Sequence, residues 1–317
     1  MSNATAISPT RHPRYRREKA EVACVLTQRD LDILRLSESF RLLTSEHIQL
    51  LVPGSDQNIL RRLQVLFHAG YLDRVRPRYV KGGGSAKMIY ALANKGAYVL
   101  QKEGLIEKRS KTDRSAGNRE LHGPFVRHRL MVSHIRALLT AACSTRPDLQ
   151  FLSWREGREI QDTVEVLLPN KYADVPVAAD GFFSLREAKG RMHLFLEADT
   201  GSMQIQRFTL KLKAYAAYWR AKKHTNKFGI RFFRVLTVTT SATRKQNLVS
   251  AAAAEDDVRA LGRMFLFADE SALSLSSPER VLGSIWTTAA GEDASLILGS
   301  DAESRNNNNL KTEVTKK

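Results

Sequence analysis

The chain has 317 residues, enough for two domains that each bury a core of their own. Its hydrophobic residues form no run long enough to span a bilayer, and the N-terminus lacks the apolar core of a signal peptide, so we expect a cytoplasmic protein with no membrane partner. The 50 Lys and Arg residues against 33 Asp and Glu give a net charge of +17, which favours a polyanionic partner over a generally basic, solvated surface.

Two cysteines, Cys24 and Cys143, lie far apart, and neither belongs to a Cys-x-x-Cys or Cys/His pattern. This spacing argues against a disulfide framework and against a zinc site. We expect both side chains to be buried thiols.

The first 20 residues are polar and basic and predict a disordered arm, which we extend to residue 27. Residues 1–120 carry 22 basic and 12 acidic residues, so the excess of positive charge per residue is greatest in this part of the chain. A region that binds DNA is therefore expected here.

Three helices are predicted after the arm. The first covers residues 28–40, the second begins at Thr44 or Ser45, and the third begins after Ser55. The apolar positions of the third helix form a stripe that should face the core, made of Ile59, Leu60, Leu63, Leu66 and Phe67.

The third helix is the predicted recognition helix. Its outward side chains, which can contact adenine and guanine edges or bind phosphates, are Gln57, Asn58, Arg61, Arg62 and Gln64. Two strands follow, joined by a glycine-rich turn whose basic neighbours are Arg76, Arg78, Lys81 and Lys87. Three helices before a basic hairpin is the order of a winged helix, and DNA is its predicted ligand. A winged helix used for protein contacts is the alternative.

The second region begins with a helix over about 124–144 and continues with strands and helices, which predicts a mixed sheet flanked by helices. A hairpin is predicted over 180–199. With its turn centred between Lys189 and Gly190, Asp180 lies opposite Asp199 and Phe182 lies opposite Glu197.

Alternation along the hairpin places Asp180, Glu197 and Asp199 on one face. The opposite, core-facing side consists of Phe183, Leu185, Leu194, Leu196 and Ala198. Three carboxylates close together repel one another and require a counter-ion, and Mg²⁺ or Mn²⁺ prefers such oxygen ligands. Two alternatives remain open. The carboxylates lie at a solvated strand end, or they pair with the next helix, where one stripe carries Arg207, Lys211 and Tyr215.

Several segments together resemble the replication-relaxation family of plasmids and mobile elements. They include LTSEHIQLL, ILRRLQVLFHAGYLDR, GGGSAKMIYALANKGAYVL, RHRLMVSHI, ADGFF, LFLEADTGSMQIQRFTLKLKAYAAYW and FRVLTVTTSATRKQNL, within residues 28–290. That family resembles the mobilisation relaxases of the MOBC class. The resemblance implies an α+β winged helix followed by an α/β domain related to restriction endonucleases, of the PD-(D/E)XK type, with a mixed sheet.

In PD-(D/E)XK sites an Asp and a (D/E)-x-K hairpin bind the metal, and MOBC-class relaxases show E-x-E at the hairpin. By this resemblance Asp180 is the first acid, although Ala179 stands where a proline is usual. Glu197 and Asp199 match the acidic pair, and no lysine stands at position 199. Lys211 could supply an ammonium group to the site instead, and a solvated lysine is the alternative.

Three further residues are weaker candidates. His128 matches a recurrent histidine of the family and could contact DNA or the scissile phosphate, although most histidines on such a helix are structural. Arg244 follows a strand end and could hold a phosphate, with a salt bridge as the alternative. Arg207 shares a stripe with Lys211 and belongs to the same helix.

Two functions from different classes follow. The first is a DNA endonuclease of a mobile element that depends on Mg²⁺ or Mn²⁺ and nicks one strand at an origin; a repair or transposon-end nuclease shares this chemistry. The second is a plasmid replication or transcription regulator whose nuclease-like domain is degenerate. Double-stranded DNA is the expected partner of both, with a second copy of the chain and other mobilisation or replication proteins as further candidates.

The expected layout has five parts. They are a disordered basic arm, a winged-helix DNA-binding domain, a linker, a nuclease-like α/β domain and a disordered tail, over residues 1–27, 28–106, 107–122, 123–295 and 296–317. The linker is charged and has no hydrophobic period, and the tail contains consecutive asparagines and no aromatic residue.

Overall fold

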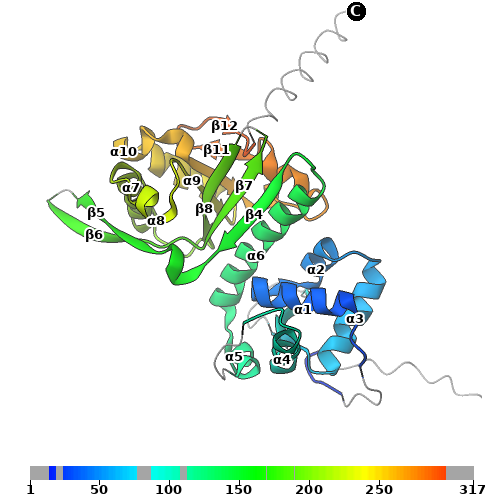
Figure 1. The fold of residues 1–317 in the computed structure, drawn as a ribbon. Helices are drawn as coiled ribbons and strands as arrows, with labels where there is room; N and C mark the ends of the chain where they lie inside the picture. The colour runs from blue at the N-terminus through cyan, green and yellow to red at the C-terminus, as the bar shows by residue number, and fades with distance from the viewer. Residues whose placement is uncertain are drawn as a thin grey trace, which may run out of the picture. The chain divides into compact units, whose positions relative to one another are not determined.

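The computed structural model describes residues 14–18, 24–76, 87–107, 113–168, 170–188 and 190–297. Over these residues the protein is a mixed α/β structure with ten α-helices and a large mixed sheet (Figure 1). The chain divides into two compact units between Leu130 and Met131, inside α6 (Gly123–Ser144). Unit 1 comprises the residues before this division and unit 2 those after it.

Unit 1 is built around a three-stranded sheet of order β1-β3-β2. Its helices and strands, in chain order, are α1 (Gln28–Phe40), β1 (Leu43–Thr44), α2 (Ser45–Leu51), α3 (Asp56–His68), β2 (Leu72–Val75), β3 (Ile89–Leu92), α4 (Asn94–Lys102) and α5 (Arg114–Glu120). The predicted starts of the first three helices are confirmed, since Thr44 is the N-cap of α2 and Ser55 that of α3. The residues between 76 and 87, with Arg78 and Lys81, lie outside the described part of the chain.

The start of α1 is fixed by a reciprocal cap. The Thr27 hydroxyl accepts a hydrogen bond from the backbone N–H of Asp30 (3.4 Å), and the Asp30 carboxylate accepts one from the backbone N–H of Thr27 (2.7 Å). Such a capping box satisfies N–H groups that have no partner within the helix. Ile33 and Leu34 then face the core and are fully buried.

The apolar stripe of α3 is narrower than predicted. Ile59, Leu63, Leu66 and Phe67 are buried, but Leu60 is 44% exposed, so its assignment to the core was wrong. At about 100° per residue, Leu60 lies at the margin of the stripe, where its side chain is partly exposed to solvent. Leu60 therefore belongs to the surface of α3.

Gly96 lets α4 approach the hairpin closely. A Cβ atom at this position would lie 2.3 Å from the carbonyl oxygen of Tyr71 and 2.7 Å from Cδ1 of Leu92. The Tyr71 carbonyl also accepts a hydrogen bond from the backbone N–H of Ala93, just before α4 (3.1 Å). Only a residue without a side chain fits between these groups.

The described parts of the expected arm and of the expected linker make defined contacts with unit 1. In the linker stretch, α5 packs against β2 and β3, and the buried Asn118 amide donates to the carboxylate of Asp73 (2.9 Å) and the carbonyl of Leu92 (3.0 Å). A single buried amide thus satisfies two polar groups at the sheet. The sequence did not predict this contact, because a polar contact of this kind leaves no hydrophobic periodicity. Both segments extend the folded body of unit 1.

Unit 2 contains a seven-stranded sheet of order β12-β11-β10-β9-β8-β7-β4. Its remaining helices and strands are β4 (Gln150–Arg155), β5 (Asp162–Leu168), β6 (Lys171–Val177), β7 (Gly181–Glu187), β8 (Gly190–Asp199), α7 (Ile205–Arg220), α8 (Lys223–Phe228), β9 (Arg234–Thr239), α9 (Ala242–Ala253), α10 (Asp256–Arg259), β10 (Phe265–Asp269), β11 (Trp286–Thr288) and β12 (Asp293–Ala294), with short 3₁₀ helices at Gly157–Ile160, Gly262–Met264, Glu270–Ala272 and Pro278–Leu282. The sheet is mixed, because β8, β9 and β10 are parallel and the other pairs are antiparallel.

The predicted register of the β7–β8 hairpin is wrong by two residues. Phe182 lies opposite Phe195, and Gly181 lies opposite Leu196. The paired strands continue to Glu187 and Gly190. The reversal of the chain is therefore centred between positions 188 and 189, one residue before the predicted centre. Gly190, with φ at +143°, allows this reversal.

The predicted faces of the hairpin are confirmed, because a shift by two residues leaves each side chain on its own side of the sheet. One face packs on α6 through a cluster that contains Phe183, Leu185, Leu194, Leu196 and Ala198. The other face carries Phe182 and Phe195 and packs on α7 and α9. The sheet is thus covered on both sides.

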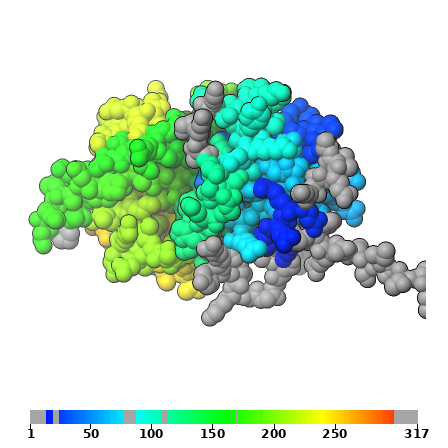
Figure 2. Space-filling model, turned by 90° about the horizontal axis from the view of Figure 1, so that it is seen from below, coloured from blue at the N-terminus to red at the C-terminus, as the bar shows by residue number. Residues whose placement is uncertain are grey.

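A two-stranded ribbon, β5–β6, projects from unit 2 as the green extension at the left of Figure 2. Its inner residues, Val164, Val166, Val175 and Val177, are buried in the core that includes α7. Leu167 and Tyr172 lie opposite each other near the tip and are 58% and 62% exposed.

Every helix in the described ranges is too short or too polar to cross a membrane. Cys143 is a buried free thiol, as expected, whereas the free thiol of Cys24 is only half-buried. Burial raises the pKa of Cys143 to about 11.

Candidate functional site

The exposed start of α3 is the first candidate site. The helix buries Ile59 and Leu63 and leaves three of the predicted DNA-contacting residues exposed, namely Gln57, Asn58 and Arg61. These side chains lie on the first two turns of the helix, and the buried residues between them hold the helix against unit 1. Amide and guanidinium groups are therefore presented together on one rigid element.

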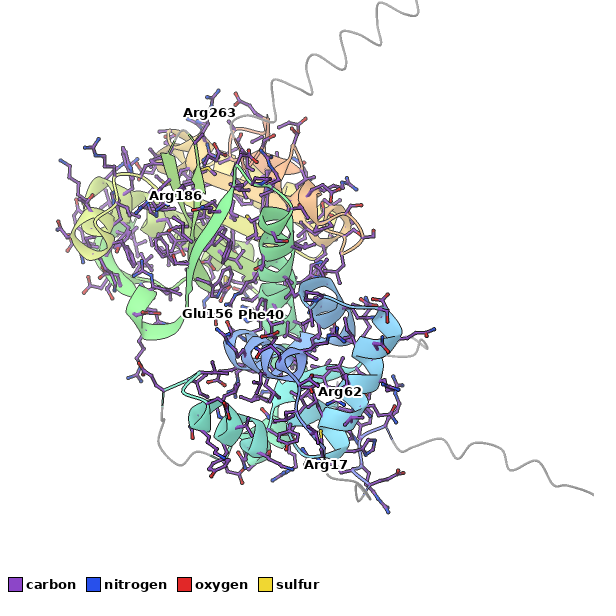
Figure 3. All side chains as sticks on the ribbon, turned by 45° about the vertical axis from the view of Figure 1, so that its right-hand side comes forward. Arg17, Phe40, Arg62, Glu156, Arg186 and Arg263 are labelled. Carbon is purple, nitrogen blue, oxygen red and sulfur yellow. The ribbon has the colours of Figure 1, made fainter. Side chains whose placement is uncertain are left out.

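Arg62 lies on the same helix but has a different environment. Its guanidinium donates to both carboxylate oxygens of Asp30, from Nε to Oδ1 (2.9 Å) and from Nη2 to Oδ2 (2.6 Å), and it also reaches the carbonyl of Val25 (3.2 Å). Burial acts to raise the pKa of Asp30, but hydrogen bonds from Arg62 and Thr27 outweigh it and lower that pKa. Arg62, labelled in Figure 3, thus joins α3 to the capped start of α1.

Arg76 and Lys87 flank residues 77–86, which lie outside the described part of the chain. Arg76 is exposed, and its guanidinium carbon lies 5.0 Å from the ring centroid of Tyr15. Lys87 forms an ion pair with Glu46, and both side chains are largely exposed. An exposed ion pair such as Lys87–Glu46 contributes little to stability, so Lys87 remains available to another anion. Arg76 is exposed and is available to an anion as well.

A basic contact that the sequence did not reveal lies beside these strands. Arg17 donates to the carbonyls of Phe67 and Leu72, both at 2.9 Å, and to the carboxylate of Asp73 at 2.6 Å. Its neighbours Arg14 and Arg16 are exposed. Arg17 therefore fixes a basic segment next to β2, although nothing in the local sequence pattern predicts its partners.

The second candidate site is the row of carboxylates in unit 2. Asp180 immediately precedes β7, and Glu197 and Asp199 lie on β8 with their side chains on the face covered by α7. The parallel register places Glu197 beside Thr237 and Asp199 beside Thr239. The structure thus brings together the three acids that the sequence selected.

Glu197 is buried and is bound by two side chains of α7. The Lys211 ammonium forms an ion pair with Oε2, and the Tyr215 hydroxyl donates to Oε1 (2.6 Å). Lys211 and Tyr215 lie at i and i+4 on the helix, which puts both above the same strand position. Both oxygens of Glu197 therefore have a donor from the protein itself.

Burial raises the pKa of Glu197 to about 7, a shift that the charge of Lys211 opposes and that of Asp180 reinforces. Burial also acts to lower the pKa of Lys211, but the charges of Glu197 and Asp180 outweigh it and raise that pKa. Burial, together with Glu197, raises the pKa of Tyr215 well above its usual value, so the phenol remains a hydrogen-bond donor.

Asp199 is enclosed by a second set of donors. Oδ2 accepts from the Thr239 hydroxyl (2.7 Å) and from Nε of Arg244 (2.9 Å), and Oδ1 accepts from the backbone N–H of Gly201 (3.2 Å). Arg244 lies in the first turn of α9 and also donates to the carbonyl of Met203 (2.5 Å). The salt-bridge alternative for Arg244 is what the structure contains.

Asp180 is half-buried, and Oδ2 accepts a hydrogen bond from the backbone N–H of Ala198 (2.8 Å). This hydrogen bond joins the start of β7 to the end of β8. Its donor, Ala198, lies between Glu197 and Asp199 in the sequence. Arg207 is exposed on α7, and its charge acts on Lys211. Asp180 and Arg207 are thus at the margin of the cluster rather than in its buried part.

The donor set of this cluster does not fit a divalent metal as it stands. Carboxylate oxygens are suitable ligands for Mg²⁺ or Mn²⁺, but those of Glu197 and Asp199 already accept hydrogen bonds from cationic side chains. Among the residues that the structure describes, no group of three or more His, Cys, Asp and Glu side chains is arranged to hold a metal ion. Lys211 and Arg244 supply the positive charge that a metal would supply.

The same sheet edge holds a related ion pair that sequence reasoning missed. Asp269 at the end of β10 lies beside Thr239 in the parallel register, is buried, and pairs with Lys245 of α9 (3.6 Å). The sequence contained a signal for the position of Asp269. The C-terminal ends of parallel strands lie at one edge of a sheet, so acids at the ends of β8 and β10 are expected near each other.

The two histidines of α6 differ from the acids in their surroundings. His128 is half-buried in unit 1, and His134 in unit 2 lies 3.3 Å from the carbonyl of Leu273 through Nε2. This contact gives His134 a structural role in unit 2.

A family model described as replication-relaxation matches residues 34–231, more than half of the chain. The matched range includes α3, Asp180, Glu197, Asp199 and Lys211, and it ends before Arg244. No curated protein and no solved structure matches the chain.

Proposed function

The chain belongs to the replication-relaxation family, and from this membership we propose that it acts in the replication of a plasmid or mobile element by binding double-stranded DNA through a winged helix in unit 1. The order of elements supports the winged helix. A short strand between α1 and α2, then α3, then an antiparallel β2–β3 pair closes a three-stranded sheet. In this arrangement α3 is the helix that enters the major groove.

The observation that carries the proposal is the exposed start of α3. Gln57, Asn58 and Arg61 are free of the unit's core and carry the groups that pair with adenine and guanine edges. Arg76 and Lys87 at the base of the hairpin add positive charge for the phosphates. Arg62 has a supporting role in this proposal, because its guanidinium is committed to Asp30.

The proposed role of unit 2 is that of a non-catalytic module. In this proposal the succession of α6, β4, the β7–β8 hairpin, α7 and β9 is that of a nuclease-like domain, as expected from the sequence. The acids at its centre are neutralised by Lys211 and Arg244, which favours a regulator with a degenerate nuclease-like domain.

Binding is tested by selecting duplexes from a random library with the full-length chain and measuring affinity by fluorescence anisotropy. We expect Arg61→Ala to weaken binding to the selected duplex about fivefold or more, since a bidentate contact to guanine contributes about 1–3 kcal/mol. The matched control is Arg263→Ala, which removes an arginine that is 88% exposed in unit 2. Equal affinities of both variants for the selected duplex would exclude α3 as the helix that recognises the DNA sequence.

A second candidate function is the metal-dependent nicking of DNA at an origin. One observation favours it. Lys211 brings an ammonium group to Glu197 and acts electrostatically with Asp180, although the usual lysine position on the hairpin is occupied by Asp199. Incubation of the full chain and supercoiled plasmid containing the selected sequence with Mg²⁺ or Mn²⁺ would decide between the candidates. Nicked circles that disappear with Asp180→Asn would favour the enzyme, and intact plasmid with specific binding would favour the regulator.

A further inference from the structure

Leu60 is an apolar side chain within the polar surface of α3. It is 44% exposed, while Ile59 and Leu63 on either side of it in the sequence are fully buried. A single exposed leucine is common on protein surfaces and has no meaning by itself. The position of Leu60 is what distinguishes it.

The neighbours of Leu60 on the helix surface are polar side chains, of which Gln57 is exposed and Gln64 is half-buried. Gln57 is three residues before it and Gln64 four residues after it, and such residues lie side by side on a helix. Arg61 follows directly and is exposed. Leu60 thus lies at the margin of the buried stripe, beside side chains that pair with adenine and guanine.

We propose that Leu60 contacts the C5 methyl group of a thymine, so that the recognised sequence contains an A·T pair at that place. This inference rests on the proposed function. The major groove offers donors and acceptors on every base pair, and the thymine methyl is its one apolar group.

The chemistry of leucine makes this contact selective. An isobutyl group packed on a base donor or acceptor removes its water and gives no hydrogen bond in return, which costs free energy. Packed on the thymine methyl, it removes apolar surface of both partners from water. Thymine is therefore favoured over cytosine at the same position, because cytosine presents an amino group and lacks the methyl.

The positive charge of the chain supports DNA as the occupant of this surface. Arg61 beside Leu60 is exposed, and unit 1 adds Arg14, Arg16 and Arg76 as exposed cations near the hairpin. A protein partner covering Leu60 would have to accommodate this charge. DNA accommodates it through its phosphates.

The test uses the duplex selected by the full-length chain, with each thymine replaced in turn by deoxyuridine, which removes only the methyl group. At one position we expect wild-type affinity to fall about fourfold, the factor that corresponds to one buried methyl-sized group. Leu60→Ala should bind the original duplex more weakly and lose its sensitivity to that replacement, because the two changes remove the same contact.

Tyr98→Ala is the matched control, since it removes an apolar side chain that is 65% exposed on α4. It should bind as the wild type does and keep the deoxyuridine effect. The inference is overturned by a selected duplex without thymine, by wild-type affinity that no deoxyuridine changes, or by Leu60→Ala that keeps full sensitivity. A change in oligomeric state alone would assign Leu60 to a protein contact and overturn it as well.

The outcomes for Leu60 and for the proposed function are separable. If Arg61→Ala weakens binding while deoxyuridine and Leu60→Ala have no effect, α3 still reads DNA and only the thymine contact is excluded. If no duplex is selected and Arg61→Ala has no effect, the proposed function fails and the inference fails with it.

Discussion

Arg62 binds both carboxylate oxygens of Asp30, and Asp30 is the residue that closes the capping box of α1. The buried carboxylate of Asp30 thus caps the start of α1 and binds Arg62 in the middle of α3. The adjacent Arg61 is exposed, and no such ion pair joins it to another residue in the part of the chain that the structure describes. The two consecutive arginines thus differ: Arg62 has a structural role, and Arg61 is exposed and has the proposed role in DNA binding.

The first prediction separates these roles. Arg62→Met should lower the free energy of unfolding by about 3 kcal/mol, because it leaves the carboxylate of Asp30 buried without its cation. Arg61→Met should stay within about 0.5 kcal/mol of the wild type. Urea unfolding of the full chain measures both, and equal losses for the two variants would contradict the assignment.

The second prediction concerns the buried pair in unit 2. Lys211→Met should cost about 3 kcal/mol, since Glu197 remains in the core without its ammonium partner. The double variant Lys211→Met/Glu197→Gln should recover at least about half of that loss. Lys213→Met on the same helix breaks a more exposed pair with Glu255 and should cost less than about 1 kcal/mol. Additive losses in the double variant would show that the pair is not coupled.

The third prediction is a pH dependence. The pKa of Glu197 is about 7 in the folded chain against 4.5 for the unfolded group, so the folded state binds this proton more tightly. Its contribution to stability is full below pH 4.5 and is lost as pH rises through about 7. Relative to Glu197→Gln, the wild type should lose up to about 3 kcal/mol across this window, at about 1.4 kcal/mol per pKa unit. Urea midpoints at several pH values measure it, and the opposite slope would mean that the pKa is lowered.

The fourth prediction concerns divalent metals. Millimolar Mg²⁺ or Mn²⁺ should leave the melting temperature of the wild type unchanged, because Lys211 and Arg244 already neutralise the acids. A rise that chelation reverses, and that is absent in Asp180→Asn, would favour the nicking enzyme. Differential scanning fluorimetry of the DNA-free protein separates this result from any effect of bound DNA.

Much of the local structure could be predicted because its causes are local. Helix starts follow from capping side chains a few residues away, as at Thr44, and the two faces of the β7–β8 hairpin follow from alternation. The register did not follow, since the length of the turn decides it. Leu60 was misplaced because periodicity marks an apolar stripe but does not show where the neighbouring elements end.

The partners of the charged residues depend on contacts between distant parts of the chain. Arg62 meets Asp30 across 32 residues, and Arg244 meets Asp199 across 45. No spacing rule connects them. The pairing of Glu197 with Lys211 and Tyr215 was foreseen as one alternative, because a helical stripe following a strand has a predictable face. The β5–β6 ribbon was missed, although alternating valines on both sides of a Pro-Asn pair were its signal.

Gly96 gives unit 1 a position at which one methyl group is enough to disturb the fold. A Cβ there would meet the Tyr71 carbonyl, which cannot move without breaking its bond to Ala93. An alanine at this site would therefore separate α4 from the hairpin without touching any residue of α3 or of the carboxylate row. We expect such a variant to lose the proposed DNA binding on warming, which would make it a temperature-sensitive allele.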